Sequence, residues 1–139
     1  MLLIENEFDI PLHVKLLEQI CTEHTPKEVE LLIIDSASMQ TLNLEHRGMD
    51  KTTDVLSFPI DDFPHAPLGS IVINHELAAQ KAKELGHSVE EEITLLFIHG
   101  MLHLLGFDHE VDSGQMREME TSWITQYHLP KSLIVRTED

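Results

Sequence analysis

The chain has 139 residues, of which 42% are hydrophobic and 24% are charged, as in soluble globular domains. Its single cysteine excludes an internal disulfide and a four-cysteine metal or iron–sulfur site, and its formal net charge of −16 disfavours non-specific binding to nucleic acid or anionic membranes. No apolar run approaches the ~20 residues that span a bilayer, and the first residues do not resemble a secretory signal. We therefore expect a single domain over residues 1–139 and a cytoplasmic location.

The first part of the chain alternates between strand and helix patterns. The expected elements are a strand over residues 2–6, a helix from Asp9 to about His24, a strand over 29–35, and a helix from Ser36 or Ser38 to about Arg47. Thr25-Pro26 ends the first helix, and Gly48 is placed to end the second. The dense aliphatic run at 29–35 is typical of a central strand that is buried on both faces.

The second part of the chain predicts strands over 55–60 and 70–74, and helices over 75–85, 89–105 and 112–128. Pro59 indicates an end or an edge for the first of these strands. Asn74 is a candidate helix cap, and Ser88 with Glu91 forms a capping box. The order of elements predicts an α+β fold, with a small mixed sheet of about four strands packed with about five helices. One stripe of the last helix is expected in the core: Met116, Met119, Trp123 and Tyr127.

The helix over 89–105 carries the candidate chemistry. Between residues 93 and 105 it is apolar all round apart from Thr94, His99 and His103, so it should be buried. His99 and His103 are four residues apart and share one face, where two imidazoles can bind one metal ion. Gly106 then ends the helix, and His109 follows as a third ligand. The pattern His-x3-His-x5-His predicts a metal site.

Three nitrogen ligands without a cysteine leave a fourth position for water or substrate, which is typical of catalytic rather than structural zinc. The spacing overlaps the metzincin protease pattern, so we expect a metzincin-like zinc helix in a metallohydrolase domain. However, Gly100 stands where that pattern has its glutamate base. The remaining polar groups near the motif are expected at the solvated surface or as helix caps: Glu92, Asp108, Glu110, His75 and His87.

Three segments resemble the YbeY family of bacterial metal-dependent endoribonucleases. They are HGMLHLLGFDH at 99–109, LNLEHRGMDKTTDVLSFP at 42–59 and LGSIVI at 68–73. Ser70 stands where the family's aspartate is expected, and His46 stands where a tyrosine is common. The resemblance extends over essentially the whole chain, because its length and element order also fit.

The resemblance implies a zinc ion, one per chain, held by His99, His103 and His109. It also implies that Arg47 faces the substrate cleft, where an arginine can bind phosphate oxygens through two parallel hydrogen bonds. The implied function is a single-strand endoribonuclease in 16S rRNA 3′-end maturation and ribosome quality control. The implied partners are ribosomal RNA and ribosomal or ribosome-associated proteins, without a membrane, and the oligomeric state is left open.

Alternatives to this function stay open at the level of the sequence. The histidine spacing alone also fits a metalloendopeptidase-like hydrolase, which Gly100 disfavours. A second alternative is a ribosome-assembly factor whose zinc site binds without catalysis. Arg47 has a structural alternative as well, because a cation in the last turn of a helix stabilises the helix dipole.

Overall fold

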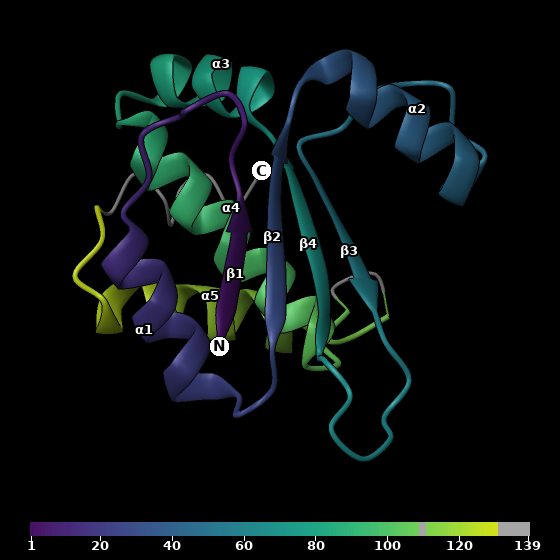
Figure 1. The fold of residues 1–139 in the computed structure, drawn as a ribbon. Coiled ribbons are helices and arrows are strands. Elements are labelled where there is room, and N and C mark those ends of the chain that lie inside the picture. Colours follow the sequence, from purple (N-terminus) through teal and green to yellow (C-terminus); the bar gives the residue numbers. More distant parts are fainter. Residues whose placement is uncertain (109–110, 131–139) are drawn as a thin grey trace.

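The computed structural model describes residues 1–108 and 111–130 (Figure 1). The elements are β1 Leu2–Glu5, α1 Val14–His24, β2 Val29–Ile34, α2 Ser36–Arg47, β3 Val55–Pro59, β4 Gly69–Asn74, α3 His75–Leu85, α4 Val89–Leu104 and α5 Gln115–Gln126. The strands form one sheet in the order β1-β2-β4-β3, in which β3 is antiparallel to β4 and the other pairs are parallel. The predicted α+β class and element order are therefore confirmed, and Pro59 lies on an edge strand.

The two faces of the sheet pack against different helices. Alternate residues of β2 and β4, such as Leu31 and Ile71, belong to the large core shared with α1, α4 and α5. The intervening residues, such as Val72, pack with Met39 of α2 in a smaller cluster. Residues of β2 alternate between buried and half-buried. The strand is therefore fully buried on one face only, and not on both faces as predicted. The smaller cluster leaves the second face partly open because α2 alone contributes a helix to it.

Helix α4 is the central helix of the larger core, where it packs against β3, β4, α1, α3 and α5 (Figure 1). Eleven of its 16 residues are buried, as the all-round apolar sequence predicts. Gly106 follows its last residues with a φ of 103°, a conformation that favours glycine. Among the helices that the structure describes, none is long and apolar enough to cross a membrane.

The start of α1 differs from the prediction. The helix begins at Val14, and Asp9 does not cap it, because Asp9 has a φ of 53° rather than the extended conformation of a cap. The side chain of Asn6 accepts a hydrogen bond from the Ile10 N–H at 3.0 Å and donates one to the Ile10 carbonyl at 2.8 Å. These two bonds occupy the backbone groups of Ile10 and hold the chain in a turn that precedes the helix.

The start of α5 also lies further along the chain than predicted, at Gln115 instead of Asp112. The carboxylate of Asp112 accepts hydrogen bonds from the backbone N–H groups of Gly114, at 2.8 Å, and Met116, at 2.9 Å. Asp112 therefore satisfies N–H groups at the helix start from outside the helix. Gly114, with a φ of 103°, makes the turn between Asp112 and the first residue of α5.

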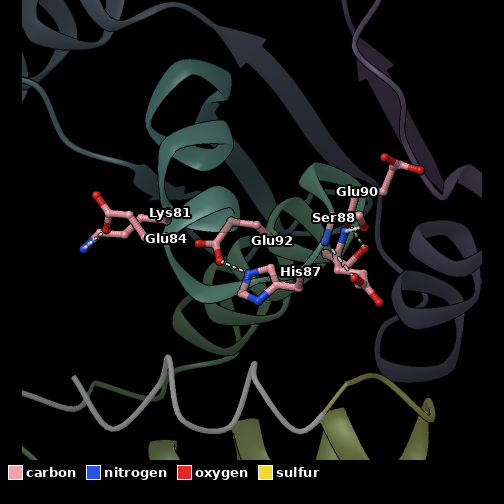
Figure 2. A network of polar contacts seen from close by, with 8 residues as sticks. Lys81, Glu84, His87, Ser88, Glu90 and Glu92 are labelled. Carbon is pink, nitrogen blue, oxygen red and sulfur yellow. Dashed lines mark hydrogen bonds and ion pairs between the residues drawn. The ribbon is translucent and has the colours of Figure 1, made fainter.

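The junction of α3 and α4 confirms the predicted caps and contains an unexpected buried pair (Figure 2). Asn74 caps α3, and Ser88 and Glu91 exchange the two hydrogen bonds of a capping box. The side chains of His87 and Glu92 are 1% and 0% exposed, and His87 Nε2 lies 2.7 Å from Glu92 Oε1. The expectation that both are surface or cap groups is wrong, because their mutual contact allows both polar side chains to be buried at the junction.

Candidate active site

A cavity of about 380 Å³ opens between α4, the end of α2 and the edge strand β3. The residues that line it are Arg47, Thr53, Asp54, Val55, Leu56, Ser57, Pro59, His99, His103 and Asp108. Arg47 is the only lysine or arginine among these lining residues. The cavity thus combines two imidazoles, two carboxylates and one guanidinium, which is a polar composition for a small cleft.

His99 and His103 lie one turn apart on α4 and turn their rings toward each other. The two Nε2 atoms are 3.1 Å apart, and the rings are nearly perpendicular, at 75°. Two nitrogens bound to one tetrahedral zinc at ~2.0–2.1 Å would lie about 3.3 Å apart. The observed distance therefore fits neighbouring metal ligands as well as an N–H···N hydrogen bond between the rings.

Glu120 of α5 contacts the other nitrogen of His99. Its Oε1 atom lies 2.8 Å from His99 Nδ1, and its side chain is 8% exposed. Helix α5 packs on α4 and supplies this carboxylate from the stripe that also buries Met116 and Trp123. The predicted core stripe therefore has a charged member that the sequence interpretation did not single out.

Gly100 explains why the protease glutamate is missing from this helix. A Cβ atom at this position would lie 2.7 Å from Cγ2 of Ile71 on β4, and Ile71 is completely buried. The helix therefore approaches β4 so closely that a side chain at position 100 would have to displace the side chain of Ile71. A glutamate here, as the base of a metzincin mechanism, would first have to displace the side chain of Ile71.

Arg47 is exposed at the C-terminus of α2 and lines the cavity. Gly48 follows it with a φ of 68°, and its N–H bonds back to carbonyls of the last turn of the helix. The buried Asn43 then donates a hydrogen bond from Nδ2 to the Lys51 carbonyl at 2.9 Å, which ties down the loop that leads to β3. This loop brings Asp54 to the cavity, so α2 and β3 present their polar groups to the same space.

The structure brings together three of the four predicted site residues: Arg47, His99 and His103. The fourth, His109, lies outside the described residues, as does Glu110. Within residues 1–108 and 111–130, no group of three or more histidine, cysteine, aspartate or glutamate side chains is arranged to hold a metal ion. The three-histidine site therefore stays a prediction, with two of its members described.

Several polar residues at the site were not found from the sequence. Asp108 was expected at the solvated surface but lines the cavity, as do Thr53, Asp54 and Ser57. Glu120 had a detectable signal, because it lies four residues after Met116 and three before Trp123, on the buried face of the last helix. A carboxylate on such a face needs a partner, and a histidine is one of the few available in this chain.

Comparison with known proteins identifies consistent relatives. The profile of a protein family described as Endoribonuclease YbeY matches residues 4–128. The chain is 64% identical over 122 residues to the Endoribonuclease YbeY of Campylobacter jejuni strain RM1221, covering 87% of this chain and 90% of the relative. It is 51% identical over 138 residues to that of Sulfurimonas denitrificans, covering 99% of each.

The fold also has a solved counterpart. The solution structure of a Thermotoga maritima protein matches with a TM-score of 0.60 at 25% sequence identity, covering 100% of this chain and 96% of the other. The resemblance proposed from the three sequence motifs is therefore confirmed by full-length relatives and by the fold.

Proposed function

This chain belongs to the YbeY family, and from that premise we propose that it is a zinc-dependent endoribonuclease that cuts single-stranded ribosomal RNA. Family membership makes it a hydrolytic enzyme, an endoribonuclease with RNA as its substrate. The finer proposal is that it acts in the cytoplasm on the 3′ end of 16S rRNA, in maturation and ribosome quality control.

One observation carries the proposal: the Nε2 atoms of His99 and His103 converge at 3.1 Å in a cavity that Arg47 also lines. We propose that His99 and His103, together with His109, hold one zinc ion per chain. When bound, zinc supplies Lewis acidity toward a phosphate oxygen and favours the ionisation of water. The histidines fix the position of this chemistry on the rigid, buried helix α4.

Arg47 supplies the positive charge that the substrate needs. A guanidinium can bind two phosphate oxygens at once and stabilise the charge that develops on them during cleavage. Its place at the end of α2 leaves it exposed and able to reach a phosphate that enters the cavity. With a net charge of −16, the protein can offer few such contacts, so ribosomal or ribosome-associated proteins are the proposed means of delivering the RNA.

A peptidase function is less consistent with the site. Gly100 excludes the glutamate base, since a Cβ at this position would overlap Ile71. Asp54 and Asp108 line the cavity but come from the β3 side and from beyond the end of α4, not from the helix position that the protease mechanism uses.

The experiment is to measure metal content and cleavage of single-stranded RNA and of a peptide substrate with the same purified protein. We expect one zinc per chain, RNA cleavage and no peptide cleavage. His103→Ala should lose most of the metal and at least 100-fold in RNA cleavage, because removing one of three ligands opens the site. Stoichiometric metal in His103→Ala would contradict the metal assignment, and metal binding without RNA cleavage would favour the assembly factor.

Arg47→Glu separates the phosphate contact from folding. Its matched control is Lys83→Glu, which makes the same charge change in the last turn of α3, where no residue lines the cavity. Both variants should cost about 0.3–1 kcal/mol of stability, the contribution of a cation near a helix C-terminus. Only Arg47→Glu should lower RNA cleavage, by at least 10-fold. Equal losses of activity in the two variants would show that overall charge, not Arg47, is responsible.

A further inference from the structure

We propose that Glu120 is a positioning residue that holds His99 as the tautomer with hydrogen on Nδ1, so that the Nε2 lone pair points toward His103. This inference rests on the proposed zinc site for its purpose, but the tautomer itself is a property of the chain without metal. The three motifs from which the resemblance was drawn, at 42–59, 68–73 and 99–109, do not include the last helix, from which Glu120 comes.

The first step is the geometry of the carboxylate. Glu120 Oε1 lies 2.8 Å from His99 Nδ1, a hydrogen-bond distance between residues 21 positions apart. An ionised carboxylate only accepts hydrogen bonds, so the hydrogen in this contact belongs to the imidazole. In the proposed arrangement, His99 carries its hydrogen on Nδ1.

The second step is the opposite side of the ring. A neutral imidazole has one N–H, so a His99 protonated on Nδ1 presents a lone pair at Nε2. This atom faces Nε2 of His103 at 3.1 Å. The two Nε2 atoms form a hydrogen bond only if His103 donates its N–H to the lone pair of His99. The lone pair of His99 is then already oriented as that of a metal ligand. Carboxylate partners of this kind fix the ring orientation and increase the basicity of metal-binding histidines in proteins.

The third step is the position of Glu120 in the core. Its neighbours on the buried stripe, Met116, Trp123 and Ile124, are at most 2% exposed, whereas Glu118 on the same helix is exposed. A carboxylate among apolar side chains costs stability unless it is hydrogen-bonded. An apolar residue would suit this stripe better for folding alone, so the carboxylate at position 120 serves His99.

The test uses ¹⁵N NMR of the histidine rings in the full-length, metal-free protein, together with zinc affinity measured by competition with a chelator. In the wild type we expect His99 to show the Nδ1–H tautomer. Glu120→Met, which keeps length and removes the acceptor, should shift His99 toward the Nε2–H tautomer and weaken zinc binding 10- to 100-fold. Glu120→Gln, which keeps an acceptor oxygen, should lie between the two.

Glu118→Gln is the control, because it removes the same charge from the exposed face of the same helix. It should leave both the tautomer and the zinc affinity unchanged. Circular dichroism confirms that each variant is folded. A wild-type His99 with hydrogen on Nε2, or a folded Glu120→Met protein with unchanged tautomer and zinc affinity, would overturn the proposal. If the wild type bound no zinc, the proposed function would fail, while the tautomer measurement would still decide whether Glu120 orients His99.

Discussion

Two imidazole–carboxylate contacts lie at opposite ends of α4, with nearly the same length and different access to solvent. At the junction with α3, His87 and Glu92 are 2.7 Å apart, and their side chains are 1% and 0% exposed (Figure 2). At the cavity, His99 and Glu120 are 2.8 Å apart, and their side chains are 25% and 8% exposed. The imidazole–carboxylate contact at the junction with α3 is therefore closed to solvent, whereas the contact at the cavity is partly open to it.

The difference teaches that exposure, not residue type or distance, separates a structural histidine from a candidate ligand in this protein. A sealed pair can satisfy only itself and its protein neighbours, so it contributes to packing. In the open pair, the second ring nitrogen of His99 faces His103 at a cavity, where a ligand could reach both rings. The first of the three predictions below tests this distinction, and the other two concern the packing of α4 and a third histidine.

The largest expected effect comes from breaking the sealed pair. His87→Leu should destabilise the protein by about 3 kcal/mol, because the fully buried Glu92 carboxylate loses its contact with the imidazole. His99→Leu should cost less, about 1 kcal/mol, since the His99 side chain is 25% exposed and lines the cavity. Urea denaturation of the two variants measures the difference. Equal losses of stability would show that solvent access does not distinguish the two contacts.

Gly100, which follows His99 on α4, tests how closely the helix must approach the sheet. Gly100→Ala should lower stability by about 1–2 kcal/mol, because the added Cβ overlaps Ile71 while the helix gains from alanine. In an Ile71→Ala background the same change should become neutral or stabilising. Thermal melting of the four proteins gives this cycle, and an unchanged cost of Gly100→Ala in that background would exclude the contact with Ile71 as its cause.

An effect confined to alkaline pH concerns a third imidazole, His24 of α1, which contacts the Tyr127 hydroxyl at 2.9 Å. Burial raises the pKa of Tyr127 to about 12, and its hydrogen bond to the Glu23 carboxylate adds to the shift. The unfolded chain ionises this tyrosine near pH ~10, so native stability should fall as the pH rises from about 10 toward 12. Tyr127→Phe should remove this part of the alkaline loss. An identical alkaline slope in the two proteins would show that Tyr127 does not titrate as the structure indicates.

Much of the fold could be predicted because the signals are local. The capping box at Ser88, the cap at Asn74 and the turn at Gly48 each depend on residues within a few positions, and all three are present. Asp9 was wrongly predicted to cap the first helix, because the Asn6 side chain, and not the Asp9 side chain, bonds the backbone N–H and carbonyl of Ile10. The strand order, with β4 between β2 and β3, depends on pairing between distant segments that no local pattern encodes.

The site was predictable to the extent that it lies on one helix. His99 and His103 follow from their spacing, and Arg47 followed from the family resemblance. Glu120 comes from another helix, and its contact with His99 depends on how α5 packs on α4. The burial of His87 and Glu92 was missed for the same reason, because sequence spacing near a helix start does not reveal what covers it.

The contact between Gly100 and Ile71 has a consequence for how such an enzyme can change over evolution. A peptidase that uses the same histidine spacing needs a glutamate at this position, and that residue requires space that β4 now occupies. A substitution of Gly100 alone would therefore lower stability before any new activity could be selected. A smaller residue at position 71 would have to make room first, so a path between the two chemistries needs two coupled changes, one in the sheet and one in the helix.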